Sequence, residues 1–308
     1  IELVPSLSSF GHMYRILSTK TCCELCELPD SEKIPYSYTY ADQHHTLNVS
    51  HPDALDFIKG LIDEYRPLFR TNKFNICADE TFDLGKGRSK ALAEEKGLVM
   101  AEAMTIYHMP LYKKLREILD AGTLGKVNLL TMNFGSFKEY DENNRFFNRN
   151  LAGGAMLDIG VYALSFVRWF LDSKPDQLLS QVRTASTGVD EQSDLLLTNQ
   201  EGQMATVMLS LHSKQPKRGM ISCERGYIEI MEYPRAGEAK VTYTDTGKTE
   251  IIEAGDNADA LYYEVLDMEH AIISGDVSAM QLGFSKDVMD LMTAFRKEWG
   301  VSYPEEER

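Results

Sequence analysis

The residues best suited to chemistry lie in residues 151–162, Leu-Ala-Gly-Gly-Ala-Met-Leu-Asp-Ile-Gly-Val-Tyr, where a glycine pair leads into an apolar run. Asp158 and Tyr162 are four residues apart, so on a helix the carboxylate would lie beside the phenol on one face. Gly153 and Gly154 allow a tight turn, or the close approach of a ligand, just before this helix. The segment therefore predicts the floor of a pocket with Asp158 and Tyr162 as catalytic candidates. The alternative is an ordinary helix N-terminus with an incidental Asp–Tyr pair.

A second pair of carboxylates, Asp79 and Glu80, follows an apolar run over residues 73–78. This run reads as a buried strand, as do residues 1–4. Between them a helix begins within residues 50–54, with a Ser or Asp cap, and keeps its helical period to about residue 65. Strand, loop, helix and strand, with carboxylates at the end of a strand, is how a βα barrel places its catalytic groups. The pair could instead cap the helix that follows it.

The elements that position the glycine pair precede it closely. Pro110 opens a helix with one apolar face, and residues 127–137 read as a strand. Arg145 and Arg149 then come just before the glycine pair, where they could hold substrate hydroxyls or a carboxylate, or remain solvated loop charges. The helix after Gly160 is apolar almost all round, which predicts burial between layers.

From residue 178 to residue 253 the apolar period becomes two, which predicts antiparallel strands, and helices at about 258–273 and 285–299 finish the chain. The expected fold begins with an α/β part made of βα units, barrel-like or Rossmann-like and incomplete. An α+β domain follows, with a large, mostly antiparallel sheet backed by helices. We expect the domains to span residues 1–125 and 126–308.

The chain has 308 residues, 43% of them apolar, and a formal net charge of −15 with a pI near 5.0. This length allows one large domain or two ordinary ones with a buried core. No run approaches the roughly 20 apolar residues of a membrane span. The negative charge argues against nucleic acid or an anionic membrane as a partner, because both would be repelled. We therefore expect small molecules, neutral ones above all, as partners.

Five cysteines, three of them at Cys22, Cys23 and Cys26, form no disulfide framework, and their odd number is typical of a reducing compartment. A metal site there would need a further ligand pair at matching spacing, which His44 and His45 do not supply. We therefore expect no bound metal. The first residues lack the basic start and apolar stretch of a signal peptide, and we expect a cytoplasmic protein.

Residues 153–162, Gly-Gly-Ala-Met-Leu-Asp-Ile-Gly-Val-Tyr, resemble the signature of the GFO/IDH/MocA oxidoreductases. The likeness is to the branch that carries Tyr where others carry His, as in dihydrodiol dehydrogenases and glucose–fructose oxidoreductase, and it runs from about residue 91 to the C-terminus. It implies that this segment opens the substrate domain, and that Asp158 and Tyr162 line the site where hydride passes to NAD(P). It also implies a small-molecule carbohydrate or diol as substrate, and a homodimer formed through the C-terminal sheet.

The N-terminal residues carry a second resemblance. Residues 2–12, Glu-Leu-Val-Pro-Ser-Leu-Ser-Ser-Phe-Gly-His, are similar to the third barrel strand of the family-twenty glycoside hydrolases, the β-N-acetylhexosaminidases, and residues 75–80 to their fourth. This likeness implies that Glu80 is the general acid, that Asp79 orients the acetamido group of the substrate, and that His12 lines the same cleft. Two strands cannot close a barrel, so we expect little glycosidase activity.

We hypothesise that the chain is a fusion, natural or engineered, joined within the helical segment 85–97. A hexosaminidase-like piece would precede the join, and residues 98–125 would be the remnant of a dinucleotide domain, with 98–104 as a buried strand. No Gly-x-Gly-x-x-Gly follows a strand, and the Gly-Lys-Gly of the joining segment is too short. The pyrophosphate cradle is then missing, and affinity for NAD(P) should fall steeply. Glu102 remains, by resemblance close to the nicotinamide.

Three functions stay open. The first is an oxidoreductase for a sugar or diol hydroxyl, impaired in cofactor binding, with Tyr162 as general acid–base and Asp158 orienting the substrate or tuning the phenol. A phenol ordinarily titrates near about pH 10, so this chemistry would need a cation close by. The second is a β-N-acetylhexosaminidase-type hydrolase at Asp79 and Glu80. The third is a non-catalytic fused scaffold.

Overall fold

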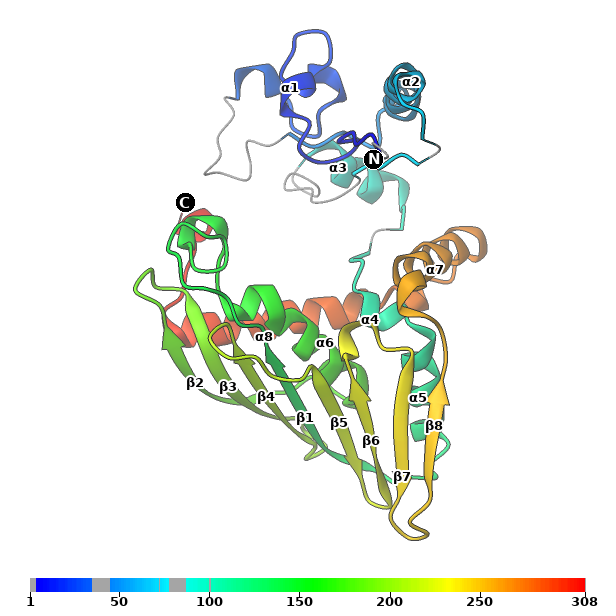
Figure 1. The fold of residues 1–308 in the computed structure, drawn as a ribbon, viewed down its shortest axis with the longest axis vertical. Coiled ribbons are helices and arrows are strands. Elements are labelled where there is room, and N and C mark those ends of the chain that lie inside the picture. Colours follow the sequence, from blue (N-terminus) through cyan, green and yellow to red (C-terminus); the bar gives the residue numbers. More distant parts are fainter. Residues whose placement is uncertain (1–3, 35–44, 72, 78–86, 100, 308) are drawn as a thin grey trace. The chain divides into compact units, whose positions relative to one another are not determined.

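The computed structural model describes residues 4–34, 45–71, 73–77, 87–99 and 101–307, apart from the side chains of residues 305 and 307. The chain divides into two compact units, Ile1–Met100 and Ala101–Arg308 (Figure 1). The larger unit holds the segment in which the sequence predicts catalytic residues.

The N-terminal unit consists of short helices around a small apolar core. The helices are α1 (Tyr14–Leu17), α2 (Ala54–Tyr65) and α3 (Arg88–Lys96), with 3-10 turns at Cys23–Leu25, Ser31–Lys33 and Arg66–Leu68. The buried side chains of the core are those of Met13, Leu17, Cys26, Leu47 and Ala54. So small a core stabilises a fold only weakly, and buried polar contacts supplement it.

A buried carboxylate holds the start of α3. Glu27 is 0% exposed, and its two carboxylate oxygens accept hydrogen bonds from the backbone N–H of Ser89 at 3.0 and 3.1 Å. The Ser89 hydroxyl donates a third bond to Glu27 Oε2 at 2.6 Å. The first N–H groups of a helix have no partner within it and carry partial positive charge, so a carboxylate suits them. Glu27 therefore accepts the hydrogen bonds of a backbone N–H group at the N-terminus of α3.

Both helices predicted in this unit are confirmed as α2 and α3, and α3 ends at Gly97, where a φ of +62° favours glycine. The strands predicted over 1–4 and 73–78 are not confirmed. Over the described residues of these segments and their neighbours, the pairing is a single parallel bridge between Ser6 and Asn75. That part of the unit forms neither a barrel nor a doubly wound sheet, so the barrel-like or Rossmann-like expectation is not confirmed either.

The strand predicted over 98–104 is wrong for the residues that the structure describes there. Leu98 is 56% exposed, and the backbone runs on irregularly into α4 (Thr105–His108). No strand among the described residues lies beside this run to pair with its backbone groups, and Met104 joins the core of the C-terminal unit instead. Residues 101–125 consequently group with that unit, whereas the sequence assigned them to the N-terminal domain.

An eight-stranded sheet forms the centre of the C-terminal unit, in the order β2-β3-β4-β1-β5-β6-β7-β8 (Figure 1). Its strands are β1 (Val127–Gly135), β2 (Gln177–Thr184), β3 (Asp190–Thr198), β4 (Met204–Ser210), β5 (Arg218–Cys223), β6 (Gly226–Met231), β7 (Glu238–Tyr243) and β8 (Thr249–Glu253). Neighbouring strands are antiparallel except β1 and β4, which run parallel. The prediction of a large, mostly antiparallel sheet is confirmed.

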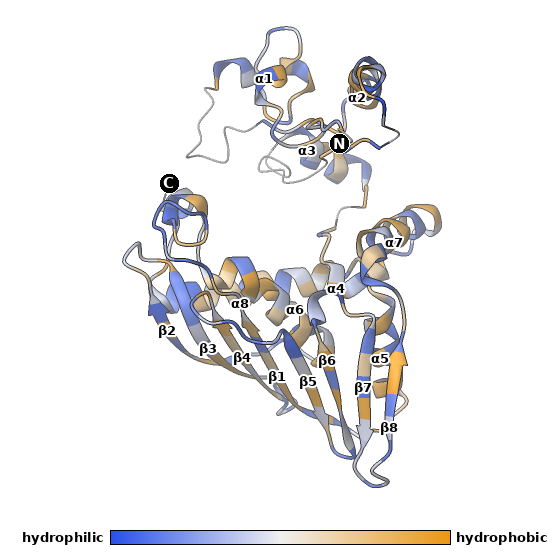
Figure 2. Ribbon diagram, viewed as in Figure 1, coloured by the Kyte–Doolittle hydropathy of each residue, from blue (hydrophilic) through white to orange (hydrophobic). Residues whose placement is uncertain are grey.

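Helices cover one face of this sheet. They are α5 (Pro110–Asp120), α6 (Val161–Phe170) and α8 (Leu282–Trp299), and α7 (Ala260–Ser274) packs on α4. Apolar and polar residues are mixed along the strands in Figure 2 because side chains alternate between the two faces of a strand. The stretch Arg149–Phe170 is apolar and long enough to cross a membrane, but 61% of its most apolar window is buried inside the unit, as in a core helix.

The other face of the sheet is open. In β4, Ala205 and Val207 point into the core, whereas Met204 and Met208 are 39% and 41% exposed. Large apolar side chains also stand exposed on other strands: Leu129, Leu179, Leu196, Met231 and Ile251. This group of methionine and aliphatic side chains is here called the open sheet face.

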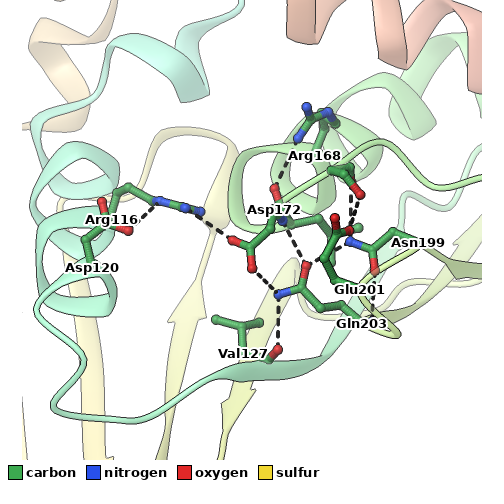
Figure 3. Close-up of polar contacts among 10 residues, drawn as sticks. Arg116, Asp120, Val127, Arg168, Asp172, Asn199, Glu201 and Gln203 are labelled. Atoms are coloured by element: carbon green, nitrogen blue, oxygen red, sulfur yellow. Dashed lines mark hydrogen bonds and ion pairs between the residues drawn. The ribbon is translucent and has the colours of Figure 1, made fainter.

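A polar network anchors the start of β1 (Figure 3). Gln203 is 5% exposed; its side-chain amide donates to Val127 O and to Asp172 Oδ2, both at 3.1 Å. Its carbonyl oxygen accepts from Asn199 Nδ2 and from the Asp172 backbone N–H, both at 2.8 Å. Arg116 of α5 approaches Asp172 at 3.3 Å. The network fixes where β1 begins relative to α5 and to the β3–β4 turn, and so where β1 ends.

Candidate functional site

Asp158 and Tyr162 line one cavity of about 530 Å³ in the C-terminal unit. The sequence predicted that these two residues lie together at a pocket, and the structure brings them together there. Their catalytic roles stay predictions. The other lining residues are Phe134, Ser136, Ile159, Lys214, Lys217, Glu232, Pro234, Arg235 and Asn257.

The parallel pair of strands brings the walls of this cavity to one edge of the sheet. Gly135 at the end of β1 lies opposite Ser210 at the end of β4. Because both strands run the same way, Ser136 after β1 and the lysines after β4 leave the sheet at the same edge. Chain segments that follow parallel strands meet in this manner in many enzyme sites.

Asp158 lies on a π-helical turn, Met156–Gly160, which leads directly into α6. The sequence predicted a regular helix here, so the wider turn is a finding of the structure. Gly160 fits it because an added Cβ would lie 2.9 Å from Met156 Sδ and 3.0 Å from Leu209 Cδ1. Single π-helical turns are rare and frequently occur at functional sites, which adds weight to this position.

Arg145 forms an ion pair with Asp158 at the cavity. Its guanidinium lies 3.1 Å from Asp158 Oδ1 and 4.2 Å from the centre of the Phe146 ring. The Asp158 side chain is 19% exposed and that of Arg145 is 64% exposed, so the ion pair lies at the rim. Such a pair contributes little stability, but it orients the carboxylate.

Arg149 is held away from the cavity lining. Its Nε donates to Ser302 O at 2.7 Å and its Nη2 to Ser302 Oγ at 3.0 Å. The guanidinium therefore ties the 3-10 turn Arg149–Leu151 to the C-terminal segment. This contact favours a structural role over the substrate-binding role that the sequence suggested.

Other parts of the chain pack closely against the backbone of the glycine pair. A Cβ on Gly153 would lie 2.7 Å from Arg145 O, and a Cβ on Gly154, whose φ is +122°, would lie 2.4 Å from Asp190 Oδ1. The Tyr303 hydroxyl donates to Gly153 O at 2.6 Å. Of the two roles considered for these glycines, the contacts support the tight turn.

A buried carboxylate supports the turn that carries Asp158. Asp190 Oδ2 accepts from the backbone N–H of Met156 at 2.7 Å. Burial raises the pKa of Asp190 to about 7, although the Met156 N–H and the charge of Arg296 favour its ionised form. The sequence offered no signal for this residue, because it lies at the start of β3, far along the chain.

Two lysines of the cavity were also missed. Lys217 Nζ lies 5.1 Å from the centre of the Phe134 ring and 3.4 Å from Glu232 Oε2, and the rings of Phe134 and Tyr162 are 6.4 Å apart. Lys214 comes from the same β4–β5 loop. The signal for them was the Ser-Lys-Gln-Pro-Lys run after β4, which becomes informative only once β1 and β4 are known to be parallel.

The model of the GFO/IDH/MocA C-terminal domain matches residues 112–229, which include the π-helical turn and most of the cavity wall. Residues 112–229 are therefore similar to a GFO/IDH/MocA C-terminal domain. Sequence relatives agree with this assignment. The chain is 25% identical over 225 residues to a trans-1,2-dihydrobenzene-1,2-diol dehydrogenase of Mus musculus, covering 71% of this chain and 67% of that protein. It is 24% identical over 308 residues to a D-xylose 1-dehydrogenase (NADP(+)) of Haloferax volcanii, covering 95% and 91%.

Solved structures share the fold of about two thirds of this chain. A 3-ketoreductase from Actinomadura kijaniata, in complex with NADP and TDP-benzene, matches with a TM-score of 0.57 at 20% identity, over 67% of this chain and 64% of that one. An aldose–aldose oxidoreductase from Caulobacter crescentus, complexed with glycerol, matches with a TM-score of 0.58 at 18% identity, over 68% and 64%. The chain thus spans less than two thirds of these structures.

Two other candidates from the sequence, Glu102 and His12, do not line this cavity. Glu102 is exposed in the segment before α4 and does not line the cavity. His12 lines a separate cavity of about 610 Å³ in the N-terminal unit and has a φ of +56°. Asp79 and Glu80 lie outside the described residues, so the hydrolase prediction stays a prediction, as does the fusion. Within the part of the chain that the structure describes, no three His, Cys, Asp or Glu side chains are grouped to hold a metal ion.

The fit of a dinucleotide to this chain is partial. The cavity of about 530 Å³ beside Asp158 and Tyr162 lies in the size range of small-molecule pockets. In dinucleotide-binding folds the pyrophosphate binds to free N–H groups at a helix start. At α3, the helix that follows the Gly-Lys-Gly run, Glu27 occupies the N–H of Ser89, and an added Cβ on Gly87 would lie 2.3 Å from Glu27 O. The described residues at this helix start therefore do not fit a pyrophosphate.

Proposed function

We propose that the chain is an oxidoreductase of the GFO/IDH/MocA type that acts on a hydroxyl of a sugar or diol, with its reacting centre in the cavity lined by Asp158 and Tyr162. The carrying observation is that a carboxylate and a phenol share one cavity at a π-helical turn. The names of the relatives, a dihydrodiol dehydrogenase and a xylose dehydrogenase, support a polyhydroxylated neutral core in the substrate.

Tyr162 would exchange the proton of the reacting hydroxyl, because a phenol both donates and accepts a hydrogen bond. Asp158, oriented by Arg145, would accept a bond from a neighbouring hydroxyl and fix which carbon reacts. The cation that such a phenol needs would be Lys217, since Phe134 contacts both Lys217 and Tyr162. These roles use side chains of the C-terminal unit alone.

Cofactor affinity is the weaker part of this function. We propose that NAD(P) binds poorly, since the sequence holds no Gly-x-Gly-x-x-Gly after a strand and Glu27 occupies the start of α3. Calorimetric titration of NAD(H) and NADP(H) into the full chain measures this directly. Micromolar binding would contradict the proposal of impaired affinity and strengthen that of a dehydrogenase.

The activity test is oxidation of sugars and diols, including xylose and trans-dihydrodiols, followed by mass spectrometry of the product with NAD(P) supplied in excess. Turnover that disappears in Tyr162→Phe supports the proposed site. Equal turnover in Tyr162→Phe would contradict it.

A homodimer through the open sheet face is a further part of the proposal. The exposed methionine and aliphatic side chains there form an apolar surface that a second copy would cover. Sedimentation over a range of concentrations tests it, and a monomer at all concentrations would contradict it.

A second function has one observation in its favour. The parallel bridge between Ser6 and Asn75 brings the two hexosaminidase-like segments side by side in the direction that barrel strands have. A chromogenic N-acetylglucosaminide tests this function, and hydrolysis would have to disappear in Glu80→Gln.

A further inference from the structure

The cavity of Asp158 and Tyr162 differs in charge from the rest of the chain. Three cationic side chains line it, Lys214, Lys217 and Arg235, against two carboxylates, Asp158 and Glu232. The whole chain, in contrast, has a net charge of −15. A locally positive cavity in an acidic protein attracts anions to that place alone.

The two carboxylates are already paired. Asp158 lies 3.1 Å from the Arg145 guanidinium, and Glu232 Oε2 lies 3.4 Å from Lys217 Nζ. The cations of these two ion pairs are Arg145 and Lys217. Lys214 and Arg235 take no part in these two ion pairs, although the charge of Arg235 partly offsets the rise that burial causes in the pKa of Glu264 on α7.

Lys214 and Arg235 make no ion pair with any side chain that the structure describes. Lys214 extends from the loop after β4, and Arg235 ends the 3-10 turn Tyr233–Arg235 after β6. Both are exposed at the cavity. They follow different strands, so an ammonium and a guanidinium reach the cavity from two separate loops. A lysine offers a point charge to an anion, whereas an arginine can bind one through two parallel N–H bonds.

Resting on the proposed function, we infer that the substrate is an anionic sugar, a carbohydrate that bears a phosphate or carboxylate bound by Lys214 and Arg235 while its hydroxyl reaches Tyr162. This departs from the neutral small molecule that the overall charge suggests. The cavity of about 530 Å³ lies in the size range of ligand pockets, with room for a sugar ring and one anionic group.

The test compares ligands that differ only in charge. Glucose, glucuronate and glucose 6-phosphate are titrated into the full chain by calorimetry, with wild type, Lys214→Met, Arg235→Met and the double variant. Lys126→Met is the control, because Lys126 is an exposed lysine that lines a different cavity, near the start of β1. NADP is titrated in parallel to show whether the two cations serve the cofactor instead.

We expect at least one anionic sugar to bind about tenfold or more tightly than glucose. In the double variant the anionic sugar should bind no more tightly than glucose, and added salt should weaken the binding of the anionic ligand alone. Tighter binding of glucose 6-phosphate than of glucuronate would identify sugar phosphates as the substrate class. Tighter binding of glucuronate would identify sugar acids. Equal affinities, no binding at millimolar ligand, a preference that survives the double variant, or cations that affect only NADP would each overturn the inference.

The outcomes separate this inference from the proposed function. Tyr162-dependent oxidation of neutral sugars without any anionic preference would leave the function standing and remove the inference. A preference that depends on Lys214 and Arg235, without any Tyr162-dependent turnover, would leave an anion-binding sugar site and remove the oxidoreductase.

Discussion

The Asp190 carboxylate accepts a hydrogen bond from the Met156 backbone N–H at 2.7 Å, so a residue of β3 closes the first turn of the helical segment that carries Asp158. The carboxylate lies against Gly154, where no side chain would fit. One buried acid therefore links the sheet, the glycine turn and the candidate catalytic residue. Substitutions at Asp190 or Gly154 should therefore lower the free energy of unfolding and also shift the turn that carries Asp158.

The first prediction concerns pH. Burial raises the pKa of Asp190 from its ordinary 3.8 to about 7, so between these values the unfolded chain ionises and the folded chain does not. The raised pKa of Asp190 therefore contributes to the free energy of unfolding at low pH. This contribution is complete below about pH 4, declines as pH rises, and is lost above about pH 7. Its upper limit is on the order of 4 kcal/mol. Asp190→Asn cannot ionise. Denaturant unfolding at several pH values should show wild type losing stability relative to Asp190→Asn between pH 4 and pH 7.5. A constant difference would mean that Asp190 does not titrate there.

A second prediction separates backbone strain from steric conflict. Gly154→Ala should be destabilising, since φ is +122° and the new Cβ would lie 2.4 Å from Asp190 Oδ1. Gly188→Ala is the control: its φ is +87°, but no heavy atom lies within 4 Å of the added Cβ. We expect about 1 kcal/mol for Gly188→Ala and about 2 kcal/mol more for Gly154→Ala, measured by urea unfolding. Equal costs would show that the Asp190 contact imposes no constraint.

The third prediction concerns turnover. Tyr162→Phe removes only the hydroxyl, so the fold should persist while oxidation of the best sugar or diol falls about a hundredfold or more. Tyr65→Phe, an exposed tyrosine of α2 in the other unit, is the control and should leave the rate unchanged. The rates should be measured together with near-UV circular dichroism. A folded Tyr162→Phe variant with the wild-type rate would exclude Tyr162 as the acid–base.

A fourth prediction addresses the open sheet face. Met208→Glu places a charge among the exposed apolar side chains and should weaken the proposed homodimer about tenfold or more. Met289→Glu, on α8 and 47% exposed, makes the same chemical change away from the sheet. Sedimentation equilibrium should find the dimer weakened in the first variant only. Equal weakening in both would mean that general charge, and not this face, governs association.

Much of the C-terminal unit could be predicted because its signals are local. The period of two between residues 178 and 253 predicts strands such as β4, and Pro110 marks the start of α5. The spacing of Asp158 and Tyr162 predicts a shared pocket, and the cavity contains both. In each case neighbours in sequence decide the outcome.

What could not be predicted depends on distant parts of the chain. The run over 98–104 has the composition of a strand, but it finds no partner among the described residues and leads into α4. Asp190 and Lys217 reach the site only because β3 and β4 lie where they do in the sheet. Arg149 looks like a ligand until Ser302, near the other end of the chain, is placed beside it.

The parallel pairing of β1 with β4 has a consequence for folding. The chain between these strands, from Ser136 to Gln203, includes α6 and the β2–β3 hairpin, so pairing must close a long loop, whereas β5 to β8 pair through short turns. Long-range closure is slow and its entropic cost comes before its contacts form. Tyr162 lies inside that loop, which begins with Ser136, and Lys214 follows β4. We therefore expect the cavity to assemble late in folding, after the strands of the β5–β8 meander have paired.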